Sequence, residues 1–155
     1  MMRDILFRGK CKDTGKWYEG YYVHLHKTTY CFKEDYDRNP DNDMHQIIFE
    51  QMMDWGLPNQ HFRVDVSPET VSEFSGLTDK NGKKIFEGDI CQIKGISYID
   101  ETPFIVEWNN EYSGWYWKNL DFGSATDAIT PEIAEMSKVI GNIHDNPELL
   151  KGGAE

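Results

Sequence analysis

The chain has 155 residues, 39% of them hydrophobic and 14% aromatic, which suits one domain or two very small ones and argues against wholesale disorder. Its net charge of −11, from 27 acidic and 16 basic residues, argues against binding through phosphates, since nucleic-acid affinity depends on Lys and Arg. The three cysteines are odd in number and widely spaced, which indicates free thiols in a cytoplasm and not a secreted disulfide framework. No signal peptide is apparent, and no run approaches the roughly 20 apolar residues that a membrane span requires.

The first third of the chain is typical of a β-hairpin. Two β-rich runs, residues 4–10 and 16–26, flank an Asp-Thr-Gly turn at residues 13–15. Residues 28–32 are predicted to form a third strand, because they too are rich in β-formers. Residues 34–43 are charged and contain Pro and Asn, so a loop is predicted there.

Residues 44–55 fit two kinds of element. Their apolar side chains are spaced for one face of a helix that stops at Gly56, whereas the Ile-Ile-Phe run at residues 47–49 fits a buried strand. Periodicity does not decide between a helix and a strand over so short a run, and both stay open. The next run, residues 61–66, alternates as a strand does.

The second half contains the strongest hairpin signal, Asn81-Gly82, which predicts a type I′ turn with positive φ at both residues. Residues 103–108 and 115–120 are predicted to form another hairpin, and a short helix is expected to begin at Pro131. Many short strands separated by turn signals favour antiparallel sheets over a parallel α/β fold. We therefore predict a mainly β protein with short-stranded antiparallel sheets and one or two short helices.

Three stretches stand out together: residues 5–22 (ILFRGKCKDTGKWYEGYY), 70–90 (TVSEFSGLTDKNGKKIFEGDI) and 139–150 (VIGNIHDNPELL). They resemble, in that order, the N-terminal hairpin, the signature and the ending of the YopX family. Members of that family are small proteins of bacteriophages and prophages, mainly β, with an SH3-like barrel element. The corner at residues 68–76 is the clearest boundary candidate, which gives an N-terminal β-rich part over residues 1–75 and a C-terminal part over 76–155, either separate or packed as one unit. The resemblance implies that the C-terminal part is a partly open SH3-like barrel. It brings no assigned activity, and so no catalytic residue.

The densest aromatic run lies in the predicted hairpin at residues 103–120. Two interpretations stay open: the rings fill a core, or at least one of them belongs to a partner surface, where Trp and Tyr are favoured anchors. Acidic neighbours at Glu107, Glu111 and Asp121 would repel phosphates, which favours a protein partner over nucleic acid. The candidate surface residues are Tyr112, Trp115, Tyr116 and Trp117.

The histidines do not predict a metal site. They lack every recognised ligand spacing, and the cysteines that would complete a zinc site are scattered along the chain. We therefore predict no metal, and expect the histidines to face solvent or to make hydrogen bonds. Those considered are His24, His26, His45 and His61.

No catalytic residue and no cofactor is predicted either. Carboxylate pairs such as Asp100 with Glu101, or Glu107 with Glu111, fit general acid–base chemistry. In a chain with 27 acidic residues, however, such pairs arise by chance. The sequence also lacks a G-x-S-x-G elbow, a P-loop and a G-x-G-x-x-G fingerprint.

These observations predict a non-enzymatic accessory protein, and the resemblance implies a phage or prophage origin and a location in the cytoplasm of the bacterial host. Its partner would be a host or phage protein, or a second copy of itself, and no membrane is involved. One alternative is a nucleic-acid-associated factor that uses residues 1–33, which carry seven basic and three acidic residues. The other is an enzyme whose site the sequence does not reveal.

Overall fold

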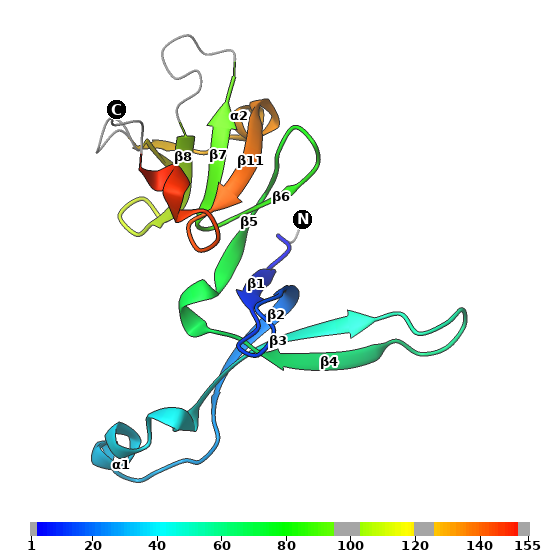
Figure 1. The fold of residues 1–155 in the computed structure, drawn as a ribbon, viewed down its shortest axis with the longest axis vertical. Coiled ribbons are helices and arrows are strands. Elements are labelled where there is room, and N and C mark those ends of the chain that lie inside the picture. The colour runs from blue at the N-terminus through cyan, green and yellow to red at the C-terminus, as the bar shows by residue number, and fades with distance from the viewer. Residues whose placement is uncertain (1–2, 95–102, 120–125, 152–155) are drawn as a thin grey trace. The chain divides into compact units, whose positions relative to one another are not determined.

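The computed structural model describes residues 3–94, 103–119 and 126–151 (Figure 1). The chain divides into two compact units, one over residues 5–72 and the other over residues 1–4 and 73–155. Both are built of antiparallel strands with a few short helices, so the predicted mainly β fold class is confirmed. Among the described residues no sheet closes into a barrel. The described helices are all too short and too polar to cross a membrane.

The unit over residues 5–72 is a β-meander in the order β4-β3-β2-β1. Its strands are β1 (Phe7–Lys10), β2 (Trp17–His26), β3 (Asp43–Gln51) and β4 (Gln60–Asp65), and its short helices are α1 (Lys33–Arg38), η1 (Pro40–Asn42) and η2 (Pro68–Thr70). The predicted hairpin around residues 13–15 is confirmed, because β1 and β2 pair antiparallel across it.

Strand β3 decides between the two interpretations of residues 44–55 in favour of a strand. It pairs with β2 on one side and with β4 on the other, and Ile47 is fully buried. A central strand satisfies its backbone N–H and C=O groups on both edges, which outweighs a helical spacing of side chains.

The predicted strand at residues 28–32 is wrong, because these residues form bends and irregular backbone. The side chain of Asn42 replaces a strand partner there: its Oδ1 accepts from the Thr28 backbone N–H and its Nδ2 donates to the Thr28 carbonyl, both at 2.8 Å. The ladder therefore ends at this point, and the segment predicted to be a loop contains α1 instead.

The unit that includes residues 73–155 contains a five-stranded sheet in the order β10-β9-β8-β7-β11 and the paired strands β5 and β6. The predicted hairpin over residues 103–120 is confirmed as β8 and β9. The helix expected at Pro131 is α2, whose first turn is capped by the Thr130 hydroxyl. The elements are β5 (Ser72–Thr78), β6 (Lys84–Phe86), β7 (Asp89–Ile93), β8 (Pro103–Asn109), β9 (Gly114–Asn119), β10 (Thr126–Ala128), α2 (Pro131–Met136), β11 (Ser137–Asn142) and η3 (Pro147–Leu150).

The core of this unit lies between its sheet and the elements that cover it. Cys91, Phe104, Val106 and Trp117 from three neighbouring strands meet Ala134 of α2 in one buried cluster. Cys91 is a free thiol in this structure, as are the other two cysteines.

The turn between β5 and β6 is not of type I′. Gly82 has a φ of 78°, but Ser113 is the only non-glycine among the described residues with positive φ, so Asn81 has negative φ. The Gly82 N–H donates to the Asp79 carbonyl and the Asp79 N–H to the Lys83 carbonyl. This is the three-residue hairpin in which a type I turn is followed by a left-handed glycine.

Candidate functional site

Four side chains that can bind metal ions lie together on one face of β2 and β3. His24 is directly opposite His45, and His26 is directly opposite Asp43. Residues two apart on a strand point to the same face, so the two cross-strand pairs are neighbours. The cluster lies entirely within the unit over residues 5–72.

The distances within the cluster are short. His26 Nδ1 lies 2.7 Å and His24 Nε2 lies 3.6 Å from Asp43 Oδ1. The rings of His24 and His45 stack with their centroids 4.2 Å apart. One ligand atom from each of His24, Asp43 and His45 lies within 4.8 Å of the others, which is close enough for one ion after side-chain rotation.

Tyr22 is the neighbour that fixes the ring of His45. Its hydroxyl lies 2.7 Å from His45 Nδ1. Burial, followed by the charge of His24, lowers the pKa of His45. Burial, followed by the charge of the nearby Asp43, raises the pKa of Tyr22.

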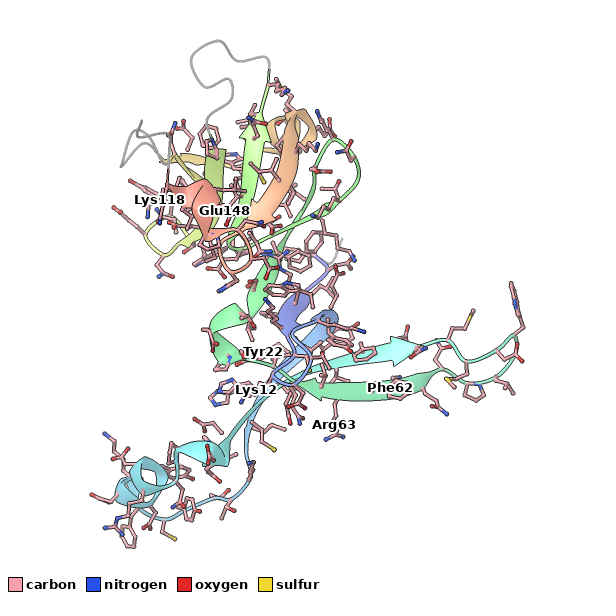
Figure 2. All side chains as sticks on the ribbon, viewed as in Figure 1. Lys12, Tyr22, Phe62, Arg63, Lys118 and Glu148 are labelled. Carbon is pink, nitrogen blue, oxygen red and sulfur yellow. The ribbon has the colours of Figure 1, made fainter. Side chains whose placement is uncertain are left out.

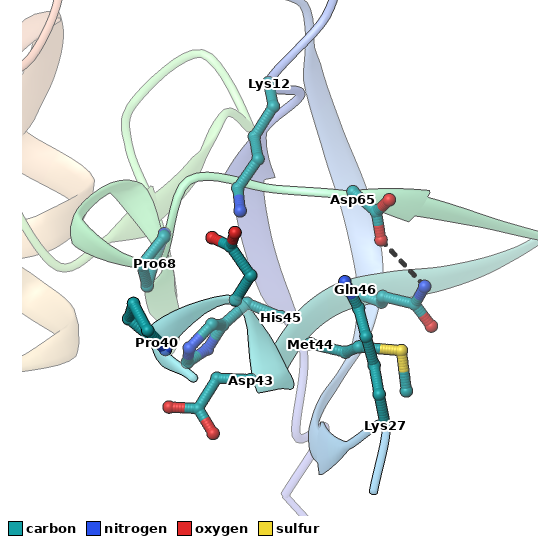
Figure 3. Close-up of a pocket in the computed structure, with 10 residues that line it drawn as sticks. Lys12, Lys27, Pro40, Asp43, Met44, His45, Gln46, Asp65 and Pro68 are labelled. Carbon is teal, nitrogen blue, oxygen red and sulfur yellow. Dashed lines mark hydrogen bonds between the residues drawn. The ribbon is translucent and has the colours of Figure 1, made fainter. Parts of the chain in front are cut away.

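A pocket of about 480 Å³ opens beside the cluster, and Asp43 and His45 form part of its wall (Figure 3). Lys12 and Lys27 also line it, so the wall carries charges of both signs. At its far side the Gln46 amide donates to Asp65 Oδ1 at 2.8 Å. The pocket makes the cluster accessible to small polar species.

The three histidines of this cluster were considered from the sequence as part of a zinc site, but that site was rejected and Asp43 was not included in it. The signal is an H-x-H at residues 24–26 and a D-x-H at residues 43–45, which meet only if residues 43–51 form a strand. His61, which was considered with them, lies apart on β4, and its Nε2 is 3.9 Å from a Glu50 oxygen. The histidines were expected to face solvent or to make hydrogen bonds, which describes each of them separately. That expectation did not include the proximity of His24, His26 and His45 to one another.

The aromatic residues of the β8–β9 hairpin divide between core and surface. Trp117 is 3% exposed and belongs to the buried cluster, against which Trp115 packs. Tyr112 is 65% exposed and stacks on the partly buried Tyr116, with the ring centroids 5.7 Å apart.

Of the acidic neighbours, Glu107 forms an ion pair with Lys118 at 3.4 Å. Asp100, Glu101 and Asp121 lie outside the described residues.

A second surface feature, which the sequence analysis also missed, is the tip of the β3–β4 hairpin. Every residue from 51 to 60 is exposed, and Trp55 is 90% exposed. Figure 2 shows side chains projecting from this hairpin, with Phe62 on its β4 arm. The sequence signal is an apolar run interrupted by turn residues. Its exposed apolar members are Met52, Met53, Trp55, Leu57 and Phe62.

The fold and both surface features thus belong to a mainly β protein with two antiparallel sheets. The sequence model of the YopX family, described as YopX protein, matches residues 6–151, and the chain belongs to that family. A crystal structure of protein EF1440 from Enterococcus faecalis is similar, with a TM-score of 0.55 and 24% sequence identity over 97% of this chain and 100% of that chain. At this identity the likeness concerns the fold alone. The search of curated proteins found no match.

Proposed function

We propose that this protein is a non-enzymatic protein-binding module that uses the tip of the β3–β4 hairpin. The observation that carries the proposal is the 90% exposure of Trp55, at a tip where Met52 and Leu57 are 64% and 60% exposed. Apolar side chains gathered on a surface commonly mark an interaction site, and Trp is among the residues that contribute most to binding. A hairpin tip presents such side chains to a groove or pocket on the partner.

The charge of the chain selects the kind of partner. With a net charge of −11, the protein attracts basic or neutral proteins and repels phosphates. The partner is a host or phage protein, or a second copy of this chain, since most soluble oligomers are symmetric homo-oligomers. Tyr112 and Tyr116 of the β8–β9 hairpin offer a second aromatic contact.

Family membership supports the remaining parts of the proposal. A phage or prophage origin, a cytoplasmic location in the bacterial host and an SH3-like character of the five-stranded unit all agree with the YopX match over residues 6–151. The sequence lacks a G-x-S-x-G elbow, a P-loop and a G-x-G-x-x-G fingerprint, which supports a binding role over an enzymatic one.

The test compares the wild-type chain with a Trp55→Ser, Leu57→Ser double variant. Phe32→Ser is the matched control, because Phe32 is 68% exposed in the same unit but lies outside the tip. Sedimentation measures self-association, and pull-down from a bacterial lysate measures binding of other proteins. We expect the wild-type and control proteins to bind the same partner, whether a lysate protein or a second copy of the chain. The double variant is expected not to bind that partner.

Identical complexes for all three proteins would contradict the proposal. Binding of DNA or RNA that weakens steeply with added salt would support the nucleic-acid alternative instead.

A further inference from the structure

We propose that His24, Asp43 and His45 bind one divalent transition-metal ion, zinc foremost, on one face of β2 and β3, where His24 and Asp43 are exposed. The two imidazoles and the carboxylate come from two neighbouring strands, and their ligand atoms lie within 4.8 Å of one another. Two nitrogens and one oxygen are ligands that zinc accepts, and imidazole also suits copper and nickel.

The backbone register brings these ligands together. His24 and His45 are directly opposite each other in the ladder, where Cβ atoms lie about 4.5–5.5 Å apart. In a tetrahedral zinc site with bonds of about 2.0–2.1 Å, ligand atoms are about 3.4 Å apart. Rotation of the side chains of His24 and Asp43, each 46% exposed, closes the remaining gap.

Two further residues orient the ligands. Metal-binding histidines usually engage their second ring nitrogen in a hydrogen bond, which fixes the tautomer and the ring direction. The Tyr22 hydroxyl, 2.7 Å from His45 Nδ1, serves this purpose and leaves Nε2 of His45 for the ion. His26, 2.7 Å from Asp43 Oδ1, holds the carboxylate in the same way and acts as a positioning residue.

The site is open on one side. Three protein ligands leave a coordination position for water, as in zinc sites that exchange ligands with solvent. Asp43 and His45 line the pocket in Figure 3, through which the ion and its water reach the cluster. This chemistry goes beyond the proposed protein-binding role, because it does not involve the hairpin tip.

The test uses the full chain, freed of any affinity tag and dialysed against a chelator. Zn²⁺ is titrated by calorimetry, and Co²⁺ is used as a visible-absorption probe of coordination. The wild-type protein is expected to bind one ion per chain and to gain thermal stability on binding. His24→Ala and His45→Ala are expected to weaken affinity by at least about tenfold, and His26→Ala by about 10- to 100-fold.

His61→Ala is the matched control. His61 also faces an acid across a ladder of the same sheet, 3.9 Å from Glu50, and its side chain is 72% exposed. This variant is expected to bind the ion with wild-type affinity. No saturable binding by the wild-type chain, or equal affinity for the His24→Ala and wild-type chains, would overturn the proposal. His24, His26 and His61 are exposed and His45 is partly buried, and circular dichroism verifies that all four variants are folded.

Discussion

At the residue scale, the carboxylate of Asp79 is the clearest case of a polar group that holds the fold together. Asp79 is 4% exposed. Its Oδ1 accepts from the N–H groups of Asn81 and Lys83 at 2.8 and 3.0 Å, and its Oδ2 accepts from that of Val139 at 3.0 Å. Burial by itself would raise the pKa of Asp79, but the three donors outweigh it and lower the pKa. One side chain therefore ties the β5–β6 turn to β11.

Replacing Asp79 by Asn is predicted to destabilise the protein by about 1.5–3 kcal/mol, the range for hydrogen bonds to charged groups. The new NH₂ group cannot accept from a backbone N–H, so at least one donor is left buried without its partner. Urea unfolding at neutral pH measures the difference.

The pH dependence of this difference has a definite sign. Because folding lowers the pKa of Asp79, its contribution to stability is present above the unfolded pKa of about 3.9 and is lost as the pH falls through the folded pKa. The wild-type and Asp79→Asn stabilities should therefore converge in acid. A gap that stayed constant down to low pH would contradict this role of the carboxylate.

Gly82 gives a second prediction at the same scale. Its φ is 78°, and a Cβ placed there would meet nothing within 4 Å, so the cost of a side chain is purely one of backbone conformation. Gly82→Val is predicted to destabilise by about 1–2 kcal/mol, since the left-handed region is unfavourable for residues with a Cβ. Gly82→Asn is the control, because Asn tolerates the left-handed region, and it should lower the stability by less than Gly82→Val in the same thermal melts. Equal costs would show that the turn is held by something else.

At the scale of elements, predictability depended on whether the determining contacts are local. The β1–β2 and β8–β9 hairpins were predicted because the turn residues lie between the strands they join. Residues 44–55 stayed ambiguous because only pairing with β2 and β4 makes residues 44–51 a strand. The histidine cluster depends on that same pairing, so its individual residues were noticed while the site was not. The left-handed Gly82 was anticipated, but the negative φ of Asn81 was not.

The β2–β3 pairing also yields a prediction. A Cβ at Gly20 would collide with the carbonyl oxygen of Ile48, a backbone atom that cannot move without disrupting the ladder. Gly20→Ala is predicted to cost about 3 kcal/mol or more, at the upper end of overpacking effects, and to expose the amides of β2 and β3 to hydrogen exchange.

Gly114→Ala is the matched control, because the nearest atoms to its Cβ are 3.6 Å away, an ordinary contact. Equal stabilities of the two alanine variants would refute the close approach at Gly20.

At the scale of the whole molecule, the charge pattern along the chain supports a protein partner. Two basic residues of the first third lie against an aromatic ring and so do not belong to a continuous phosphate-binding stripe. The Arg8 guanidinium lies 4.9 Å and the Lys10 ammonium 5.9 Å from the centre of the Trp17 ring. Arg8 is also buried. The family match over residues 6–151 extends across both units.

The pairing of β7 with β11 has a consequence for the order of folding. In the unit over residues 5–72, strands that follow one another in the chain lie side by side, so this meander can form as soon as it leaves the ribosome. In the five-stranded sheet β7 (Asp89–Ile93) pairs with β11 (Ser137–Asn142), which is synthesised much later. Pairing between strands so far apart in the sequence slows folding. Until β11 is added, one edge of β7 is unpaired during synthesis, and its apolar residues are open to premature association with other nascent chains.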